Sequence, residues 1–348
     1  MRIGFVVNQI KTEKPRFTTV LLAYRMHQQK HDAFFLNVAD LEYYADDRVG
    51  GRGVRPAGNS YKKMETYLRA LQSDEAEREM LSAGDLDVIF LRNDPSIEPP
   101  SRYWAKSAGF MFGQAAARQG VIVVNDPFAL ANAATKLNFQ NLPAPTRPRT
   151  IISRDAAQIR AFIENEGGDV ILKPLEGSGG KNVFVVKEGQ HDNLNQIIEN
   201  LREDGYIVVQ EYVPQAADGD IRLFVMNGDP LQVDGKFAAL RRSNDSDDPR
   251  SNMHVGGRAS RVAIDDGVLE LAAMIRPYLV ESGLFLVGLD IVGDKLLEVN
   301  AFSPGGLYSC CELQGVDFTA PIIAALQKKV EFRRAYGNRL RNRIIAAL

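Results

Sequence analysis

Short apolar runs alternate with longer amphipathic segments along the first 125 residues of the chain. Four of these runs are too short for buried helices and predict buried strands, at 3–7, 34–38, 87–91 and 121–124. The segments 18–29 and 60–82 carry apolar residues at helical spacing and predict helices. Strands that alternate with helices form parallel sheets covered by helices, so we expect a Rossmann-like domain over residues 1–125.

After residue 125 the pattern changes to shorter strands and fewer helices. Residues 150–213 predict the order strand, helix, two strands, helix, strand. Farther on, one helix is predicted at 267–283 among strands at 206–213, 221–226, 231–240, 285–292 and 296–299. We therefore expect two α+β units, a central domain at 126–205 and a C-terminal domain at 206–326.

Two charged segments stand out from this pattern. Residues 241–252 are almost wholly polar and predict a mobile loop. Residues 327–348 form a basic extension, in which seven Lys or Arg residues accompany a single acid, Glu331, and they predict a helix interrupted near Gly337-Asn338. A helix docked on the body or at a subunit interface is the ordinary interpretation, and contact with an anionic partner is the alternative.

Composition and charge exclude several classes of protein. The 348 residues carry 42 Lys and Arg against 44 Asp and Glu, a net charge of −2, which argues against a general nucleic-acid binder. The first apolar run is too short for a signal peptide, and no run reaches the roughly 18 apolar residues of a membrane span. The two cysteines, Cys310 and Cys311, are adjacent and cannot build a disulfide framework. We therefore expect a cytoplasmic protein with no nucleic-acid or membrane partner.

A lysine followed by a glycine-rich loop is the first sign of chemistry. Lys173 lies on a predicted strand, four residues before Gly177-Ser178-Gly179-Gly180. Glycine-rich loops let backbone N–H groups close on phosphate oxygens, and a lysine beside such a loop can bind the same phosphates. A hairpin turn and a surface lysine are the ordinary alternatives, because the loop matches neither the P-loop nor the dinucleotide-binding motif.

Three oxygen-bearing side chains lie on two successive predicted strands. Asp290 interrupts an apolar strand, and a buried carboxylate needs a cation or a hydrogen-bonding partner. Glu298 and Asn300 are two residues apart, so they share a face of the next strand. Such ligands suit Mg²⁺, and a surface-facing acid pair is the alternative. For Asp290 to face Glu298, we expect a three-residue or bulged turn near Asp294.

Arginines complete the candidate site. Arg222 starts a predicted strand and Arg258 follows a glycine pair. Either is ordinarily a surface charge, but beside a phosphate site each could neutralise developing negative charge. Arg92 follows the strand at 87–91, at the carboxyl end where parallel sheets bind ligands.

The order of these motifs, together with a second lysine at Lys136, resembles the ATP-grasp superfamily. Over residues 1–326 the chain resembles the bacterial glutathione synthetases. The resemblance is carried by Leu91–Pro95, Val124–Pro127, Ile171–Leu175, Gly177–Gly180, Gln210–Pro214, Asp218–Arg222, Asn252–Arg258, Val287–Gly293 and Glu298–Asn300. It implies an ATP-grasp fold of mixed α/β and α+β type behind an N-terminal Rossmann-like, parallel-sheet domain.

The resemblance also implies a role for each position. ATP would be held by two lysines, the glycine loop, an adenine-binding hinge and a partner for the sugar: Lys136, Lys173, Gly177, Ser178, Gly179, Gly180, Gln210, Glu211, Tyr212, Val213 and Asp220. One or two Mg²⁺ ions, or Mn²⁺ in their place, would be held by Asp290, Glu298 and Asn300. Arg222 and Arg258 would be catalytic, and substrate would meet Arg92, Asn252 and Ser303, with 241–252 as a lid.

The implied reaction is an ATP-dependent ligation. A carboxylate of γ-glutamylcysteine attacks the γ-phosphate of ATP, and glycine displaces phosphate from the resulting acyl phosphate. The family tends to form homo-oligomers. The chain departs from the family's usual Ser-Pro-Thr with Ser303-Pro304-Gly305-Gly306, which leaves open a related ATP-grasp ligase with a different acceptor amine. A non-catalytic nucleotide-binding scaffold is the alternative of a different class.

Overall fold

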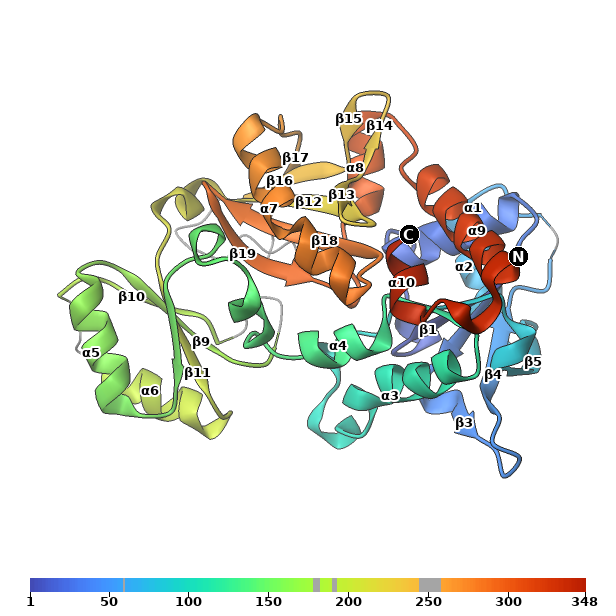
Figure 1. Cartoon of the computed structure of the whole chain (residues 1–348), viewed down its shortest axis with the longest axis horizontal. Helices are drawn as coiled ribbons and strands as arrows, with labels where there is room; N and C mark the ends of the chain where they lie inside the picture. The colour runs from blue at the N-terminus through green and yellow to red at the C-terminus, as the bar shows by residue number, and fades with distance from the viewer. Residues whose placement is uncertain (59, 178–181, 190–192, 244–257) are drawn as a thin grey trace.

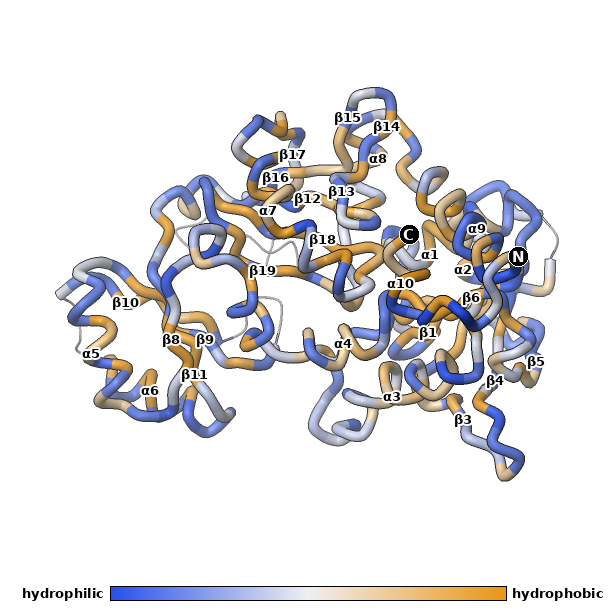
Figure 2. The backbone as a smooth tube through the Cα atoms, viewed as in Figure 1, coloured by the Kyte–Doolittle hydropathy of each residue, from blue (hydrophilic) through white to orange (hydrophobic). Residues whose placement is uncertain are grey.

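The structure, a computed structural model, describes residues 1–58, 60–177, 182–189, 193–243 and 258–348. Figure 1 shows its three larger sheets along an elongated molecule: the N-terminal sheet at one end with both chain termini, the small central sheet at the other, and the third between them. In Figure 2 the hydrophobic stretches follow strands and the inner sides of helices, while the connections are hydrophilic.

Four parallel strands form the centre of the N-terminal sheet. They are β1 (Arg2–Val7), β2 (Asp32–Asn37), β6 (Val88–Leu91) and β7 (Ile122–Val124), in the order β2-β1-β6-β7. Their apolar residues are buried on both faces, because α1 (Thr18–Gln28) covers one face and α3 (Ala105–Arg118) the other. The predicted parallel sheet is confirmed.

The expected helix at 60–82 is wrong in its second half. Helix α2 ends with the apolar spacing, at Met64–Leu71, and the following residues form strand β5 (Glu77–Ser82). Strand β5 pairs antiparallel with β4 (Val49–Arg55), which also pairs with β3 (Leu41–Tyr43) and β2, so the sheet is mixed. The glycines of β4 allow this close pairing, since a Cβ at Gly50 would lie 2.1 Å from the Leu81 carbonyl oxygen.

The central sheet follows the predicted order of elements. Strands β8 (Thr150–Ser153), β9 (Val170–Pro174), β10 (Phe184–Val186) and β11 (Ile207–Glu211) are antiparallel in the order β10-β9-β11-β8. Helices α5 (Ala156–Glu166) and α6 (Leu194–Glu203) bury their apolar residues in a separate small core on this sheet. Gly167 ends α5 with a left-handed φ of 64°, as its position predicts.

The third sheet has the order β17-β16-β12-β18-β19, with β13 (Asp229–Pro230) beside β12. Its strands are β17 (Arg258–Ser260), β16 (Ala239–Ser243), β12 (Asp220–Met226), β18 (Leu286–Val292) and β19 (Lys295–Asn300). The predicted helix is α7 (Asp266–Ser282). The expected strand at 231–240 is instead a hairpin of β14 (Gln232–Val233) and β15 (Lys236–Phe237), because Asp234-Gly235 takes the positive φ values of a tight turn.

The β18–β19 hairpin brings Asp290 opposite Glu298, as expected, but by another route. Its turn has only two residues, since Val292 pairs with Lys295, so the expected three-residue or bulged turn is wrong. The extra residue is Leu297, which forms a bulge between the Asp290–Glu298 pair and the Ile291–Leu296 pair. One extra residue is needed for Asp290 to face Glu298, and it lies in strand β19 instead of the turn.

The C-terminal residues form α8 (Leu307–Gln314), α9 (Thr319–Tyr336) and α10 (Asn342–Ala347). The basic extension is therefore helical and interrupted near residue 337, as predicted, and it is docked on the body. Lys329 is fully buried: its Nζ donates to Asn227 Oδ1 (2.8 Å) and to the Ile345 carbonyl (3.2 Å). The Asn342 amide bonds to the backbone of Val123 in the N-terminal sheet.

Short elements complete the fold. They are α4 (Pro127–Ala133) and the 3₁₀ turns Ile10–Thr12, Val38–Asp40, Ala83–Asp85, Pro95–Ile97, Pro100–Arg102, Asn138–Asn141, Ala144–Thr146, Pro214–Asp218 and Gly337–Arg339. Among the described helices, none combines the length and the apolar character that crossing a membrane requires.

Asn125 joins the N-terminal sheet to the third sheet, and its loss should destabilise the protein. This fully buried side chain donates to the carbonyls of Leu286 (3.0 Å) and Ala301 (2.5 Å) and accepts from Leu286 N (2.8 Å). Asn125→Ala leaves these buried groups unpaired, so we expect a loss of about 3 kcal/mol in the free energy of unfolding, measured by urea denaturation. The exposed Asn141→Ala should change it by less than about 0.5 kcal/mol; equal effects would contradict this role.

Candidate active site

Three neighbouring strands of the third sheet present a row of charges on one face. Arg222 on β12 pairs with Asp290 on β18, which pairs with Glu298 on β19. Directly paired residues of antiparallel strands point to the same side, so these three side chains are neighbours. Two residues along the sheet, Asp220 pairs with Arg242 of β16 and extends the charged row.

Asp290 is the centre of a buried ion-pair network. Arg222 contacts it with two nitrogens, Nε and Nη2, the second at 2.9 Å, and Arg242 Nη2 lies 2.7 Å from Asp290 Oδ2. Arg242 also donates to both oxygens of Asp220. Burial alone raises the pKa of the Asp290 carboxyl, but Arg222 and Arg242 outweigh it and bring that pKa to about 2. Asp290 is therefore ionised.

Glu298 is the less compensated of the two carboxylates. Burial raises the pKa of the Glu298 carboxyl, and the charge of Asp290 raises it further, although nearby cations partly offset both effects. Asn300 lies on the same strand face and donates to Asp290 Oδ2 at 3.1 Å. These three oxygen-bearing side chains fit Mg²⁺, because a cation beside Glu298 would relieve the repulsion that raises its pKa. Across the described residues, no three His, Cys, Asp or Glu side chains cluster as metal ligands, so the candidate set needs the Asn300 amide.

Two half-buried lysines lie near Glu298. Lys173 Nζ donates to Gln210 Oε1 at 2.9 Å, and Lys136 Nζ donates to the Gly177 carbonyl at 2.7 Å. Burial lowers the pKa of Lys173 to about 8, and the charge of Lys136 adds to the effect. Burial also lowers the pKa of Lys136. Two half-buried ammonium groups that repel each other are suited to an anionic ligand.

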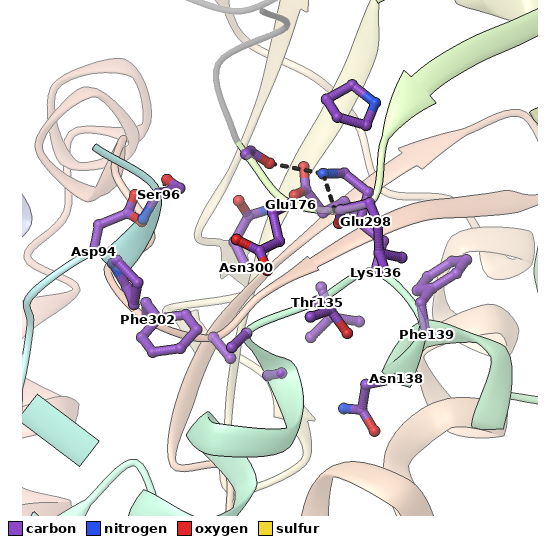
Figure 3. A pocket seen from close by; sticks show the side chains of 18 of the residues that line it. Asp94, Ser96, Thr135, Lys136, Asn138, Phe139, Glu176, Glu298, Asn300 and Phe302 are labelled. Atoms are coloured by element: carbon purple, nitrogen blue, oxygen red, sulfur yellow. Dashed lines mark hydrogen bonds between the residues drawn. The ribbon is translucent and has the colours of Figure 1, made fainter. Parts of the chain in front are cut away.

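A cavity of about 600 Å³ lies between the central and third sheets and brings these groups together. Figure 3 shows Lys136, Glu298 and Asn300 grouped on one side of it, with Asp94 and Ser96 of the N-terminal domain opposite. Seven of the sequence-predicted site residues line it: Lys136, Lys173, Gly177, Gln210, Glu298, Asn300 and Ser303. A volume of this size with convergent polar groups is typical of a ligand site.

Other predicted residues border this site or lie apart from it. Glu211 forms an ion pair with Arg149 (2.8 Å), the Tyr212 amide donates to Asp169, and Val213 begins the turn after β11. Both oxygens of Asp220 accept hydrogen bonds from Arg242, so its expected contact with the nucleotide sugar stays a prediction. Arg258 is exposed at the start of the edge strand β17.

Several predictions fall on residues that the structure does not describe. Ser178, Gly179 and Gly180 of the glycine loop, and Asn252, lie outside the described residues, as does most of the predicted lid at 241–252. The first three residues of that segment belong to β16. Arg92 is buried beside the Ser303–Gly306 loop, where its Nη2 donates to the Pro304 carbonyl at 3.3 Å.

Arg242 was not among the site residues predicted from the sequence, because it falls in a segment predicted to be a polar loop. In the structure it is 7% exposed and contacts both Asp220 and Asp290. The apolar run that ends at Leu240 could have indicated this position. A strand that continues two residues beyond Leu240 places Arg242 on the same face as Leu240. Pairing of that strand with β12 then sets Arg242 opposite Asp220.

The sheets and the buried charged cavity define the class of protein. Solved structures with this arrangement include D-cycloserine synthetase DcsG, with a TM-score of 0.59 and 14% identity, covering 93% of this chain and 99% of that one. The ATP-grasp ligase PsnB with minimal precursor, Mg and ADP has a TM-score of 0.56 and 18% identity, covering 94% and 98%. At these identities the likeness shows the fold alone, which is the ATP-grasp fold expected from the sequence.

The family follows from closer relatives. The model of the prokaryotic glutathione synthetase N-terminal domain matches residues 1–131, and that of the prokaryotic glutathione synthetase ATP-grasp domain matches residues 135–315. Glutathione synthetase of Shewanella oneidensis is 32% identical over 335 residues, 95% of this chain and 99% of that protein. The Escherichia coli K12 enzyme is 36% identical over 255 residues, 73% of this chain and 75% of that protein. The chain belongs to the prokaryotic glutathione synthetase family and is an ATP-dependent carbon–nitrogen ligase.

We expect Lys173 to make nucleotide binding sensitive to pH. Its ammonium loses its proton as pH rises through about 8, and only the charged form attracts polyphosphate. The dissociation constant of a Mg-bound, non-hydrolysable ATP analogue should therefore rise about eightfold from pH 7.5 to 9, measured by calorimetry. Lys173→Met should bind weakly at both pH values with little dependence. An unchanged slope in that variant would exclude Lys173 as the titrating group.

Proposed function

We propose that this chain joins γ-glutamylcysteine to glycine with ATP, through an acyl phosphate, and releases ADP and phosphate. The observation that carries the proposal is the cavity between two sheets, where Lys136 and Lys173 lie near the Glu298 carboxylate, itself paired with Asp290 on the next strand. Family membership supports the choice of substrates. No residue acts as a covalent nucleophile in this reaction, so catalysis rests on positioning and charge neutralisation.

The nucleotide lies along the face of the central sheet. Lys136 and Lys173 bind its phosphates, and Gly177 to Gly180 close over them. The adenine binds at the end of β11, where Gln210 lines the cavity and leads into Glu211, Tyr212 and Val213. Because Gln210 accepts a hydrogen bond from Lys173, it also orients the lysine that meets the phosphates.

Asp290, Glu298 and Asn300 would hold the Mg²⁺. The ion would supply positive charge that neutralises the phosphates. Asp290 is oriented by Arg222 and Arg242, which leave its carboxylate ionised. A cation beside Glu298 would lower the pKa of its carboxyl, since that charge would offset the burial that raises it. Mn²⁺ carries the same charge and is proposed as a substitute.

Arginines neutralise the charge that develops during the reaction. Arg222 lies beside Asp290 and donates with Nη1 to the Gly305 carbonyl at 3.1 Å, so it touches both the metal site and the acceptor loop. We assign Arg222 and Arg258 the catalytic role on the transferred phosphoryl group, with Arg242 as a positioning residue. Arg92 and Ser303 meet the dipeptide, and Asn252 belongs to the proposed lid.

The Ser303–Gly306 loop controls which amine the reaction accepts. Gly306 has a φ of 106°, and Arg92 and Arg222 hold the two preceding carbonyls, so the loop has a defined path between the domains. Glycine is the acceptor that the family supports, and a different small amine is the second candidate because this loop lacks the family's usual threonine. A homo-oligomer in the cytoplasm is proposed on the resemblance alone.

The direct test is release of phosphate from Mg-ATP. We expect turnover that requires both γ-glutamylcysteine and glycine, with glutathione identified by mass spectrometry. Turnover with alanine or another small amine but not with glycine would assign the second candidate. Tight nucleotide binding without turnover on any pair would contradict the proposal.

Loss of Glu298 should abolish turnover without unfolding the protein. Glu298→Ala removes a metal ligand from a polar cavity, so we expect the kcat for glutathione formation to fall about 10³-fold while the unfolding midpoint changes little. The matched control is Glu281→Ala on the exposed side of α7, which should retain the rate. Near-normal activity of Glu298→Ala would exclude it as a ligand.

A further inference from the structure

The N-terminal sheet has a topological switch point between β1 and β6. Strands β1 and β6 are parallel neighbours, but the chain leaves β1 toward β2 on one side and β6 toward β7 on the other. Connections that diverge in this way open a crevice beyond the carboxyl ends of the two strands, where doubly wound sheets bind ligands. Residues that follow β1 and β6 therefore face a candidate subsite.

Arg92, directly after β6, has an unused hydrogen-bond donor in this crevice. Its side chain is 3% exposed and lies 5.2 Å from the Phe90 ring. Its Nε donates to Thr19 Oγ1 at 3.1 Å and its Nη2 to the Pro304 carbonyl at 3.3 Å. Its Nη1 is buried without a partner among the described residues. A buried guanidinium nitrogen without an acceptor is costly, and such an orphan marks the place of an anionic ligand.

Glu13, from the segment after β1, is the matching acceptor. Its Oε2 is buried without a partner among the described residues. The segment is held in place by Gln72, whose Nε2 donates to the carbonyls of Ile10 (2.8 Å) and Glu13 (3.1 Å). Burial raises the pKa of the Glu13 carboxyl to about 7, and the nearby charge of Arg92 lowers it in part, so the two side chains are close. No ion pair joins them among the described residues, and each keeps a buried atom for a third group.

We propose that Glu13 and Arg92 bind the free α-amino acid end of the γ-glutamyl substrate, Glu13 taking its ammonium and Arg92 its carboxylate. A ligand with both charges on one carbon would satisfy the two unpaired groups together. The inference rests on the proposed function for the identity of the peptide. Nothing in the nucleotide or metal chemistry requires Glu13, so the proposal adds a specificity-determining residue to the site.

The position of this subsite fits the reaction. Arg92 and Arg222 hold successive carbonyls, those of Pro304 and Gly305, so one loop links the crevice to the metal site. A peptide lying along this loop has its amino acid end at Arg92 and its other end, the cysteinyl carboxylate, toward Asp290 and Glu298. The α-linked isomer carries its ammonium and its free glutamyl carboxylate on different carbons, so it cannot meet both residues in the same way.

The test compares two substrates with two proteins. Glutarylcysteine keeps the shape and reacting carboxylate of γ-glutamylcysteine but lacks the ammonium. The wild-type protein should prefer γ-glutamylcysteine about 100-fold in kcat/KM, because a site built for a polar group rejects the analogue that lacks it. Glu13→Gln should lose most of this preference through a higher KM for γ-glutamylcysteine, with kcat nearly unchanged. Its kcat/KM for glutarylcysteine should stay within about threefold of the wild type.

Controls separate the possible outcomes. Glu65→Gln, exposed on α2, should keep the wild-type preference. A Glu13→Gln variant that loses both substrates equally, or neither, would overturn the subsite. Binding of γ-glutamyl-α-aminobutyrate and its glutaryl analogue, measured by calorimetry without ATP, tests the subsite independently of turnover. Selective binding that depends on Glu13 in a protein without ligase activity would refute the proposed function alone. Turnover without that selectivity would refute the subsite alone.

Discussion

A buried carboxylate beside a half-buried one is the constraint on which the rest of the site depends. Asp290 and Glu298 occupy paired positions on neighbouring strands, where their mutual repulsion and their burial both favour the neutral acids. Arg222 and Arg242 keep Asp290 charged, and Lys136 and Lys173 partly compensate Glu298. Four basic side chains, those of Arg222, Arg242, Lys136 and Lys173, therefore lie around the two carboxylates. This arrangement suits a metal-bound polyphosphate.

The same network connects the domains. The Ser303–Gly306 loop leaves β19 just after the metal site and is held by Arg222 on one side and by Arg92 of the N-terminal domain on the other. Asn125 bonds to both β18 and the residue after β19, and the docked C-terminal extension bonds to β7. These contacts hold Arg92 and the candidate metal ligands in a defined relation to each other.

Patterns in the sequence correctly predicted the helices and strands that depend on neighbouring residues. The strands β1, β6 and β7 are continuous apolar runs, and α7 is delimited by the Asp265 cap and Gly283, so both were found from sequence. The failures occurred where partners are distant. The segment 77–82 is a strand because it pairs with β4, and Arg242 joins the site because β16 pairs with β12. One extra residue was needed for Asp290 to face Glu298, but the sequence did not show that this residue is Leu297, in the strand.

The sequence by itself determined the kinds of group present. The order of lysines, glycine loop, arginines and oxygen ligands indicates an ATP-grasp ligase, and it can be read from the chain because the residues within each motif are close in sequence. Only the tertiary structure decided which charges compensate each other and which are left unpaired. Asp290 is satisfied by two arginines that are 68 and 48 positions away, whereas Arg92 and Glu13 each keep a buried atom without a partner. Burial and hydrogen bonding across strands set these differences, and neither has a signature in local spacing.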